Sequence, residues 1–209
     1  MTLIIGLHGR AVNTRGKRVG GKLVGKSVVA DFMIEHHGFV RNKMAGPLKN
    51  TSRAMLREAG YDDAMIERII EGDLKDHWII PELGCTGRVL QVRMGTEFGR
   101  DMIHPDLWVN LWRSRTKVIS LGSSIVADDI RFENEARTIR ALGGVVVVVQ
   151  RTVGDDYPRV DHPSETTDIV GDHLIVNYST IAKLRKQAEL LVQTLVSRAR
   201  PPLELVGAV

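Results

Sequence analysis

GRAVNTRGKRVGGKLVGKSVVADF, residues 9–32, contains overlapping copies of one glycine-lysine pattern, G-x-x-x-x-G-K-[ST]. Residues 20–27 match this pattern fully, whereas residues 16–23 match it only until Leu23 takes the place of the hydroxyl residue. A glycine-rich turn of this kind lets backbone N–H groups point at an anion, and the helix that follows adds the positive end of its dipole. The stretch therefore predicts a phosphate-binding loop at Gly25-Lys26-Ser27. In such a loop the lysine reaches the β- and γ-phosphates and the serine hydroxyl binds Mg²⁺.

The first glycine of this loop can be assigned in two ways. Residues 3–7 (LIIGL) are apolar and β-branched, so they predict a buried strand, which such a loop normally follows directly. Gly20 lies well beyond the end of this strand and would need a long connecting arm. Gly9 follows the strand at once, and removing residues 12–22 leaves GRALVGKS, which is itself a full match. We prefer Gly9, with residues 12–23 looped out of the phosphate-binding turn.

The composition is that of an ordinary globular protein, with 43% apolar and 26% charged residues in a chain of 209. This length fits one domain, or one domain with an inserted lobe. The single cysteine, Cys85, excludes an internal disulfide and suits a reducing cytoplasm. The longest apolar run, residues 145–149, is too short to span a bilayer.

The net charge of +4 is concentrated near the start of the chain, where five basic residues crowd together. They are Arg10, Arg15, Lys17, Arg18 and Lys22. This crowding favours an anionic ligand, and the alternative is a basic loop that is merely solvated.

Strands alternate with helices along most of the chain, which predicts an α/β fold with a parallel sheet of about five strands covered on both faces. We expect strands at residues 3–7, 39–44, 117–120, 124–129, 145–150 and 174–178. We expect helices at residues 27–36, 90–98, 104–113, 133–142 and 181–198, and further helices within 48–78. The predicted core comprises residues 1–44 and 117–200, the predicted helical lobe residues 45–116, the possible lid residues 151–171 and the flexible tail residues 201–209.

A second group of polar residues follows the predicted strand at 124–129. Asp128 and Asp129 lie at the carboxyl end of this strand, where parallel sheets bind their ligands. Asp129 and Arg131 share a face if the chain is extended, and Glu135 follows one turn into the next helix. Such a rim can hold an Mg²⁺-bound water, a phosphate, and a sugar or base edge. The alternative is a surface cluster of ion pairs.

At these residues the chain resembles the bacteriophage deoxynucleoside monophosphate kinases, over nearly its whole length. The most specific segments are GRVLQVRMGTEFGRDMIHPDLWVN (87–110) and DDIRFENEARTIRALGG (128–144). GLHGR with GKSVVADF, GFVRNKMAGPLK (38–49), HPSE (162–165) and DHLIVN (172–177) add to the resemblance. It implies a three-layer P-loop NTPase fold with an inserted helical nucleotide-binding lobe. The implied activity is ATP- and Mg²⁺-dependent phosphorylation of a dNMP to a dNDP, which feeds phage DNA synthesis in the host cytoplasm.

The resemblance also implies roles for particular residues. The implied ATP phosphate site comprises Gly9, Gly25, Lys26 and Ser27, and the implied metal ligands are Ser27 and Asp128. The implied acceptor site comprises Leu48, Lys49, Arg88, Gly95, Thr96, Trp108, Asp129, Arg131 and Glu135. Among these groups Lys26, Asp129 and Arg131 would be catalytic, because phosphoryl transfer needs positioning and charge neutralisation more than covalent help. Trp108 would either stack on a base or pack in the core. Arg151 and Arg159 would close as a lid or stay solvated, and a homodimer is possible.

Three departures from the family pattern bear on the activity. Ser27-Val28 stands where members commonly have Asp-Thr, and Gly46 stands where Asp is frequent. The extra residues 12–23 fall where phosphates should sit, so they are either a tolerated bulge or an obstacle to ATP. Two other functions stay open. One is a P-loop kinase of another small acceptor, such as dephospho-coenzyme A. The other is a non-catalytic nucleotide- or nucleic-acid-binding protein, although the basic stretch lacks the interleaved aromatics of single-strand binders.

Overall fold

The computed structural model describes residues 2–154, 157 and 167–199. Its contacts divide the chain into two compact units, one formed by residues 1–41 with 119–209 and the other by residues 42–118. The second unit nearly coincides with residues 45–116, which the sequence predicts to be a lobe. Arg159, the HPSE segment, most of the possible lid and the tail at 201–209 lie outside the described residues.

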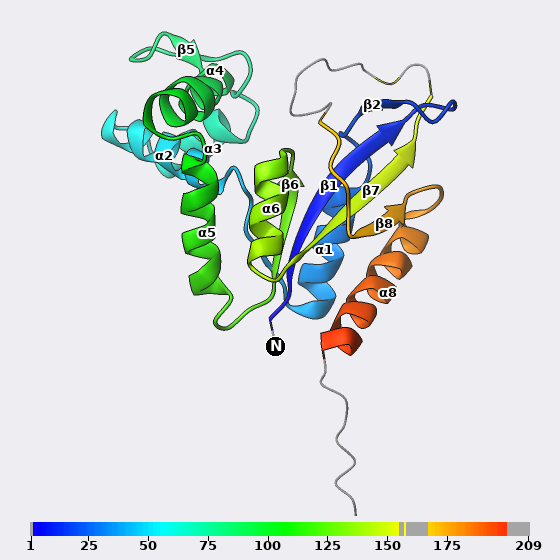
Figure 1. The fold of residues 1–209 in the computed structure, drawn as a ribbon. Helices are drawn as coiled ribbons and strands as arrows, with labels where there is room; N and C mark the ends of the chain where they lie inside the picture. The colour runs from blue at the N-terminus through cyan, green and yellow to red at the C-terminus, as the bar shows by residue number, and fades with distance from the viewer. Residues whose placement is uncertain (1, 155–156, 158–166, 200–209) are drawn as a thin grey trace, which may run out of the picture. The chain divides into compact units, whose positions relative to one another are not determined.

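The first unit is built on a mostly parallel sheet (Figure 1). Its strands, in spatial order, are β3 (Val40–Arg41), β6 (Ile125–Ile130), β1 (Ile4–Val12), β7 (Val145–Thr152) and β8 (His173–Val176). Each of these strands runs parallel to its neighbours, and the short β2 (Arg18–Gly20) pairs antiparallel with the end of β1. Runs such as Val145–Val149 are buried because a parallel sheet is covered on both faces.

Helices cover both faces of this sheet (Figure 1). On one face α1 (Lys26–His37) and α8 (Ile181–Ala199) pack together over a core that includes Ile5, Leu7 and Val147. On the other face lies α6 (Glu133–Ala141), so close that a Cβ at Gly6 would come within 2.3 Å of Ile139 Cδ1. The prediction of an α/β fold with a mostly parallel sheet is confirmed, and the architecture is consistent with a P-loop kinase-like fold.

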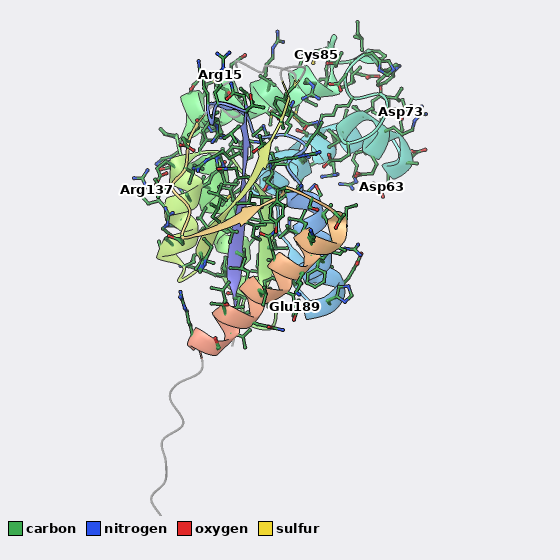
Figure 2. The ribbon with its side chains drawn as sticks, turned by 90° about the vertical axis from the view of Figure 1, so that its right-hand side faces the viewer. Arg15, Asp63, Asp73, Cys85, Arg137 and Glu189 are labelled. Carbon is green, nitrogen blue, oxygen red and sulfur yellow. The ribbon has the colours of Figure 1, made fainter. Side chains whose placement is uncertain are left out.

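The second unit consists mainly of helices. They are α2 (Gly46–Glu58), α3 (Asp63–Ile70), α4 (Gly87–Arg93), the π-helix η1 (Met94–Ile103) and α5 (Leu107–Ile119). The apolar faces of α2, α3, α4 and η1 share a separate core that includes Leu56, Ile66 and Ile70. A two-stranded hairpin of β4 (Ile79–Ile80) and β5 (Cys85–Thr86) completes the unit, and it carries the single cysteine (Figure 2).

The structure corrects two of the predicted elements and extends a third. Residues 117–119, predicted to begin a strand, form the end of α5, and Val118 is 69% exposed, which does not suit a buried strand. The lobe contains β4 and β5, whose two-residue lengths leave no alternation to read in the sequence. Strand β1 continues to Val12, well past the predicted end, because β2 pairs with its last residues. Within the described parts of the chain, no helix is both long enough and apolar enough to cross a membrane.

Candidate active site

The extra residues 12–23 form a β-hairpin that prolongs the central strand. Ala11 pairs with Gly20 and Val12 pairs with Arg18 across the hairpin. The turn is held by Asn13, whose Oδ1 accepts hydrogen bonds from the N–H groups of Arg15 at 3.1 Å and Lys17 at 2.8 Å. The chain therefore continues along β1, turns, and comes back antiparallel to the end of β1.

The returning chain forms a turn beside Gly9, and this turn leads into α1. Lys26 Nζ donates a hydrogen bond to Gly21 O at 2.7 Å. A Cβ on Gly9 would lie 2.2 Å from that oxygen and 2.4 Å from Lys26 Nζ. The choice between Gly9 and Gly20 as the first glycine of a phosphate-binding loop stays a prediction, and the turn itself comprises residues 20–27. Gly9 lies in β1 against it and leaves the space that the turn occupies.

The carbonyl groups of residues 21–24 are all bound by side chains from other parts of the first unit. Gly21 O accepts from Lys26 Nζ, Lys22 O from Tyr157 Oη at 2.9 Å, Leu23 O from Arg151 Nη1 at 3.1 Å and Val24 O from Asn177 Nδ2 at 3.0 Å. Carbonyl oxygens repel phosphate, and these four are directed at protein donors. The first N–H groups of α1 have no partner within the helix, so the turn presents donors to an anion.

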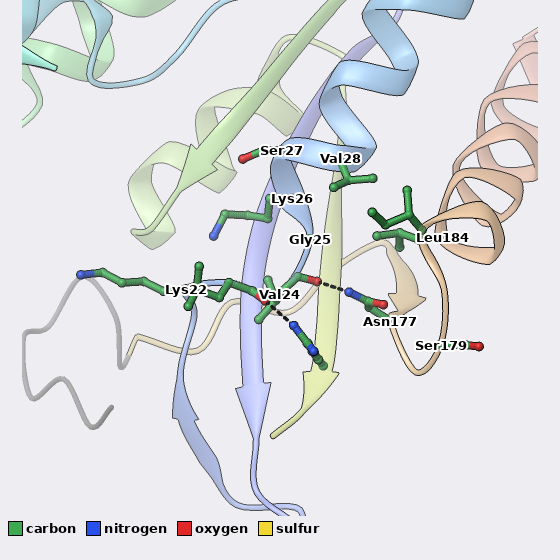
Figure 3. Close-up of a pocket in the computed structure, with 12 residues that line it drawn as sticks. Lys22, Val24, Gly25, Lys26, Ser27, Val28, Asn177, Ser179 and Leu184 are labelled. Atoms are coloured by element: carbon green, nitrogen blue, oxygen red, sulfur yellow. Dashed lines mark hydrogen bonds between the residues drawn. The ribbon is translucent and has the colours of Figure 1, made fainter. Parts of the chain in front are cut away.

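The last step into α1 depends on a glycine. Gly25 has φ of +103°, and a Cβ there would lie 2.7 Å from Leu184 Cδ2 and 2.9 Å from Asn177 Nδ2. Only glycine combines this backbone conformation with this close approach. The helix then begins at Lys26, and Ser27 is exposed in its first turn, with its side chain pointing away from Leu184 (Figure 3).

A cavity of about 850 Å³ adjoins the turn, and its size is within the range of small-molecule sites (Figure 3). Its lining comes from the turn, from the start of α1, from Arg151 and from the segment that joins β8 to α8. The lining residues include Val24, Gly25, Val28, Asn177, Ile181 and Leu184. An apolar wall beside an anion-binding turn suits a ligand that has both a flat apolar part and phosphates.

Asp128 places a buried carboxylate in β6, next to β1. Its side chain is 7% exposed, and Oδ2 lies 3.3 Å from Arg41 Nε. Its Oδ1 is buried and has no hydrogen-bond partner among the described residues. Arg41 also binds Asp31 at 2.6 Å. A buried acceptor without a partner is costly, so this oxygen fits the role of a ligand to a cation better than a purely structural role.

The other residues of the predicted rim have different environments. Asp129 is half-buried and Arg131 is exposed at the end of β6. Glu135 is 6% exposed, and its Oε2 accepts hydrogen bonds from the N–H groups of Arg131 at 2.7 Å and Phe132 at 3.1 Å. Its carboxylate therefore caps the start of α6. This bond fixes the backbone of Arg131, so we expect Glu135 to act on an acceptor through that arginine.

A buried histidine, which the sequence analysis did not single out, connects the hairpin to the end of β6. His8 is 2% exposed; its Nδ1 lies 3.0 Å from Ile130 O and its Nε2 lies 3.1 Å from Arg18 Nη1. Because a guanidinium only donates, Nε2 accepts and Nδ1 carries the proton. The pKa of His8 is lowered from 6.5 to about 4, chiefly by burial and also by the nearby charges of Arg18, Lys26 and Arg10, against the opposing effect of the Ile130 bond.

This neutral histidine predicts a loss of stability in mild acid. The unfolded chain binds a proton at His8 near the ordinary value of 6.5, whereas the folded chain binds it only near 4. As pH falls through this window the unfolded state binds more protons, so the free energy of unfolding falls by up to about 3 kcal/mol from this group. Urea unfolding at pH 7 and pH 5 measures the effect. In His8→Gln the decrease in the free energy of unfolding should be smaller, and parallel curves for both proteins would contradict the assignment.

Gly9→Ala tests the packing of β1 against the phosphate-binding turn. The added Cβ would overlap Gly21 O and Lys26 Nζ, so one of them must move. We expect ATP affinity to fall about tenfold or more and stability to fall by about 1–3 kcal/mol. Gly122→Ala is the control, since its Cβ would meet no atom of the described chain within 4 Å. Calorimetric titration with ATP and thermal unfolding measure the two effects. Equal results for the two variants would count against this packing.

Most residues predicted in the second unit have structural partners within it. Lys49 Nζ pairs with Glu71 at 2.6 Å, and Arg88 pairs with Asp76. Leu48 packs against the apolar core, a Cβ on Gly95 would lie 3.4 Å from Leu48 Cδ2, and Thr96 is exposed in η1.

Trp108 adopts the packing role that the sequence left open. It is 6% exposed, and its Nε1 donates a hydrogen bond to Gly95 O at 3.0 Å. A Cβ on Gly99 would lie 2.4 Å from the same nitrogen, so the indole ring fills the space above that glycine. The ring therefore offers no open face for a base to stack on in this structure.

Comparison with known proteins adds one relative. No protein-family model matches the chain. A protein of Acanthamoeba polyphaga mimivirus named "Putative deoxynucleotide monophosphate kinase" is 29% identical over 190 residues, which cover 81% of this chain and 91% of the viral protein. The likeness supports a nucleotide kinase family. It extends over both units of the structure, and it agrees in general terms with the resemblance noted in the sequence.

Proposed function

We propose that this protein transfers the terminal phosphoryl group of ATP to a deoxynucleoside monophosphate, giving a deoxynucleoside diphosphate and ADP. The observation that supports it most is the turn 20–27, which lies beside a cavity. Lys26 and the first N–H groups of α1 can bind an anion there, because the four carbonyl groups of the turn are bound by protein donors. The relative named as a deoxynucleotide monophosphate kinase supports the choice of acceptor.

In this proposal the turn holds the ATP phosphates and the cavity holds its base and sugar. Lys26 is a point charge that neutralises the β- and γ-phosphates, and it would exchange its bond to Gly21 O for the nucleotide. Arg151 and Asn177 keep the turn in shape through its carbonyl groups. Ser27 and Asp128 would hold Mg²⁺, which, when bound, neutralises charge on the phosphates.

The end of β6 would hold the phosphate of the acceptor. β1 and β6 are parallel neighbours, so their carboxyl ends meet at the same edge of the sheet. Arg131 follows β6 directly and its backbone is fixed by Glu135, which prepares the guanidinium for a phosphate. Asp129 is suited to a sugar hydroxyl. For the second unit, the prediction stands that Leu48, Lys49, Arg88, Gly95 and Thr96 contact the acceptor nucleotide.

The proposal is tested by following ADP release from ATP and Mg²⁺ with each dNMP in turn. We expect turnover with at least one dNMP, and the matching ribonucleotides show whether the sugar is selected. Turnover with dephospho-coenzyme A and with no dNMP would show that the acceptor is dephospho-coenzyme A. No turnover together with salt-sensitive binding of single-stranded DNA would instead support the non-catalytic function.

Arg131→Ala should weaken the binding of the acceptor nucleotide more than the binding of ATP. We expect the KM for the dNMP to rise about tenfold or more, because a charge-assisted contact to phosphate is lost, while the KM for ATP changes little. Arg137→Ala is the control, since this exposed arginine lies in α6 within the same unit (Figure 2). Steady-state kinetics with each substrate varied in turn decide the matter. Equal increases in both KM values would contradict the assignment.

A further inference from the structure

Three cations gather at the carboxyl end of β1. Lys26, Arg10 and Arg18 all act on His8 electrostatically and lower its pKa, so they all lie near this buried ring. The carboxylate of Asp168 binds two of them, with Oδ1 at 2.7 Å from Arg10 Nη2 and at 3.0 Å from Arg18 Nη1. Asp168 is 63% exposed, and it is the carboxylate that the ion pairs of the described residues place on Arg10 and Arg18. The cluster is therefore suited to an anion of higher charge, such as a polyphosphate.

Arg18 is the member of this cluster that comes from the inserted hairpin, and it is firmly held. Its side chain is 15% exposed. Nη1 contacts His8 Nε2 at 3.1 Å, and Nη2 donates a hydrogen bond to Gly9 O at 3.2 Å. A guanidinium fixed in this way keeps its fork oriented, so binding an anion costs little conformational entropy.

Arg18 and the lysine of the turn both approach Gly9, at different atoms of that residue. Arg18 Nη2 binds Gly9 O, and the space where Gly9 would carry a Cβ is occupied by Lys26 Nζ and Gly21 O. The two cations thus flank one residue of β1. The same histidine that orients Arg18 also binds Ile130 O, next to Arg131. Arg18 is thus linked through Gly9 to the proposed donor turn and through His8 to the end of β6.

We propose that Arg18 is a catalytic residue that binds the phosphoryl group during its transfer, so that the hairpin contributes a cation to the site. This inference rests on the proposed function. In the reaction the bond between the γ-phosphorus and the β–γ bridging oxygen breaks and ADP leaves with that electron pair. An acceptor phosphate oxygen forms the new bond to phosphorus. Arg18 stays protonated throughout and neutralises the charge on the oxygens of the transferring group, and the Asp168 carboxylate marks where such an anion binds.

Arg18→Ala and Arg15→Ala make a matched pair of variants. Both remove one arginine from the same hairpin, but Arg15 is exposed at its turn (Figure 2). We expect kcat of Arg18→Ala to fall roughly a hundredfold, with a smaller change in the KM for ATP, and Arg15→Ala to stay within about twofold of the parent. Arg18→Lys should recover only part of the loss, because ammonium lacks the fork. Added guanidinium ion should restore turnover to Arg18→Ala and leave Arg15→Ala unchanged.

The outcomes separate this inference from the function on which it rests. If the parent protein phosphorylates a dNMP while Arg18→Ala and Arg15→Ala are equally active, the inference is wrong and the function stands. Thermal unfolding is measured for both variants. A loss in Arg18→Ala that guanidinium ion does not restore, together with a large fall in melting temperature, would assign Arg18 a structural role only and would also overturn the inference. If the parent protein turns over no dNMP, the proposed function itself fails.

Discussion

Lys26→Ala is expected to remove nearly all phosphoryl transfer, lowering kcat/KM by about a thousandfold or more. Lys26 Nζ is the charged group at the centre of the turn 20–27, where it binds Gly21 O in the unliganded chain. Its loss removes the point charge that neutralises the β- and γ-phosphates, and catalysis of this reaction depends chiefly on such charge neutralisation. The fold should persist, because the methylene stem of Lys26 is only half-buried and the turn keeps its bonds to Tyr157, Arg151 and Asn177.

The measurement is ADP release as the concentrations of ATP and dNMP are varied, which gives kcat/KM, with Lys17→Ala as the control. Lys17 lies in the hairpin that precedes the turn, is exposed, and binds Asn13 through its backbone N–H and carbonyl groups. Its removal changes the net charge by the same amount, so it accounts for any general electrostatic effect on nucleotide binding. Turnover in Lys26→Ala comparable to that of Lys17→Ala would mean that the turn 20–27 does not hold the donor phosphates.

Much of the first unit could be predicted because its signals are local. The valine run at 145–149 is typical of a buried strand, which the structure has there. Gly25-Lys26-Ser27 indicates the start of a helix independently of the residues before it. The end of α5 was misjudged because Val118 and Ile119 favour strands by local preference, while the helix simply continues through them. Tertiary context overrides such preferences most readily in short segments.

The parts of the site that escaped prediction depend on contacts between residues far apart in the sequence. His8 is one residue in an apolar strand, and its significance lies in bonds to Ile130 and Arg18 that no spacing reveals. The path of residues 12–20 likewise depends on the pairing of β1 with β2, which the sequence does not reveal. The sequence offered one usable signal, a histidine directly before the glycine that follows a buried strand. Polar residues at that position occur where strand ends build sites.

In the second unit, the family resemblance implies contacts with the acceptor nucleotide that the packing of the side chains does not show. Trp108 resembles a residue of an acceptor site, yet its ring lies against Gly99 and its indole nitrogen binds Gly95 O. Its contribution would then be to hold η1, a π-helix that carries Thr96 on its exposed side. π-helical segments are uncommon and are often found at functional sites. The unusual helix therefore supports a role for the GTEFGR segment without a stacking tryptophan.

Asp128→Asn should lower turnover about a hundredfold and raise the Mg²⁺ concentration needed for half-maximal rate. Asp128 Oδ1, which has no hydrogen-bond partner in the described part of the chain, is suited to a hard cation, and an amide is a far weaker ligand for Mg²⁺ than a carboxylate. Stability should change little, because Arg41 keeps its bond to Asp31 at 2.6 Å and the substitution removes a buried charge. The replacement has nearly the same shape, so a loss of activity would not come from a cavity.

Asp31→Asn is the matched control for this substitution. Asp31 binds the same arginine, but its side chain is 46% exposed, against 7% for Asp128. We expect Asp31→Asn to keep its rate within about threefold, because an exposed partner of Arg41 contributes little and solvent replaces it. Rates are followed as Mg²⁺ is titrated at fixed nucleotide, and thermal unfolding is recorded for both variants. An unchanged Mg²⁺ dependence in Asp128→Asn would remove Asp128 from the metal site. An equal shift in both variants would show that the cation responds to the charge of the whole Arg41 cluster and not to the buried oxygen.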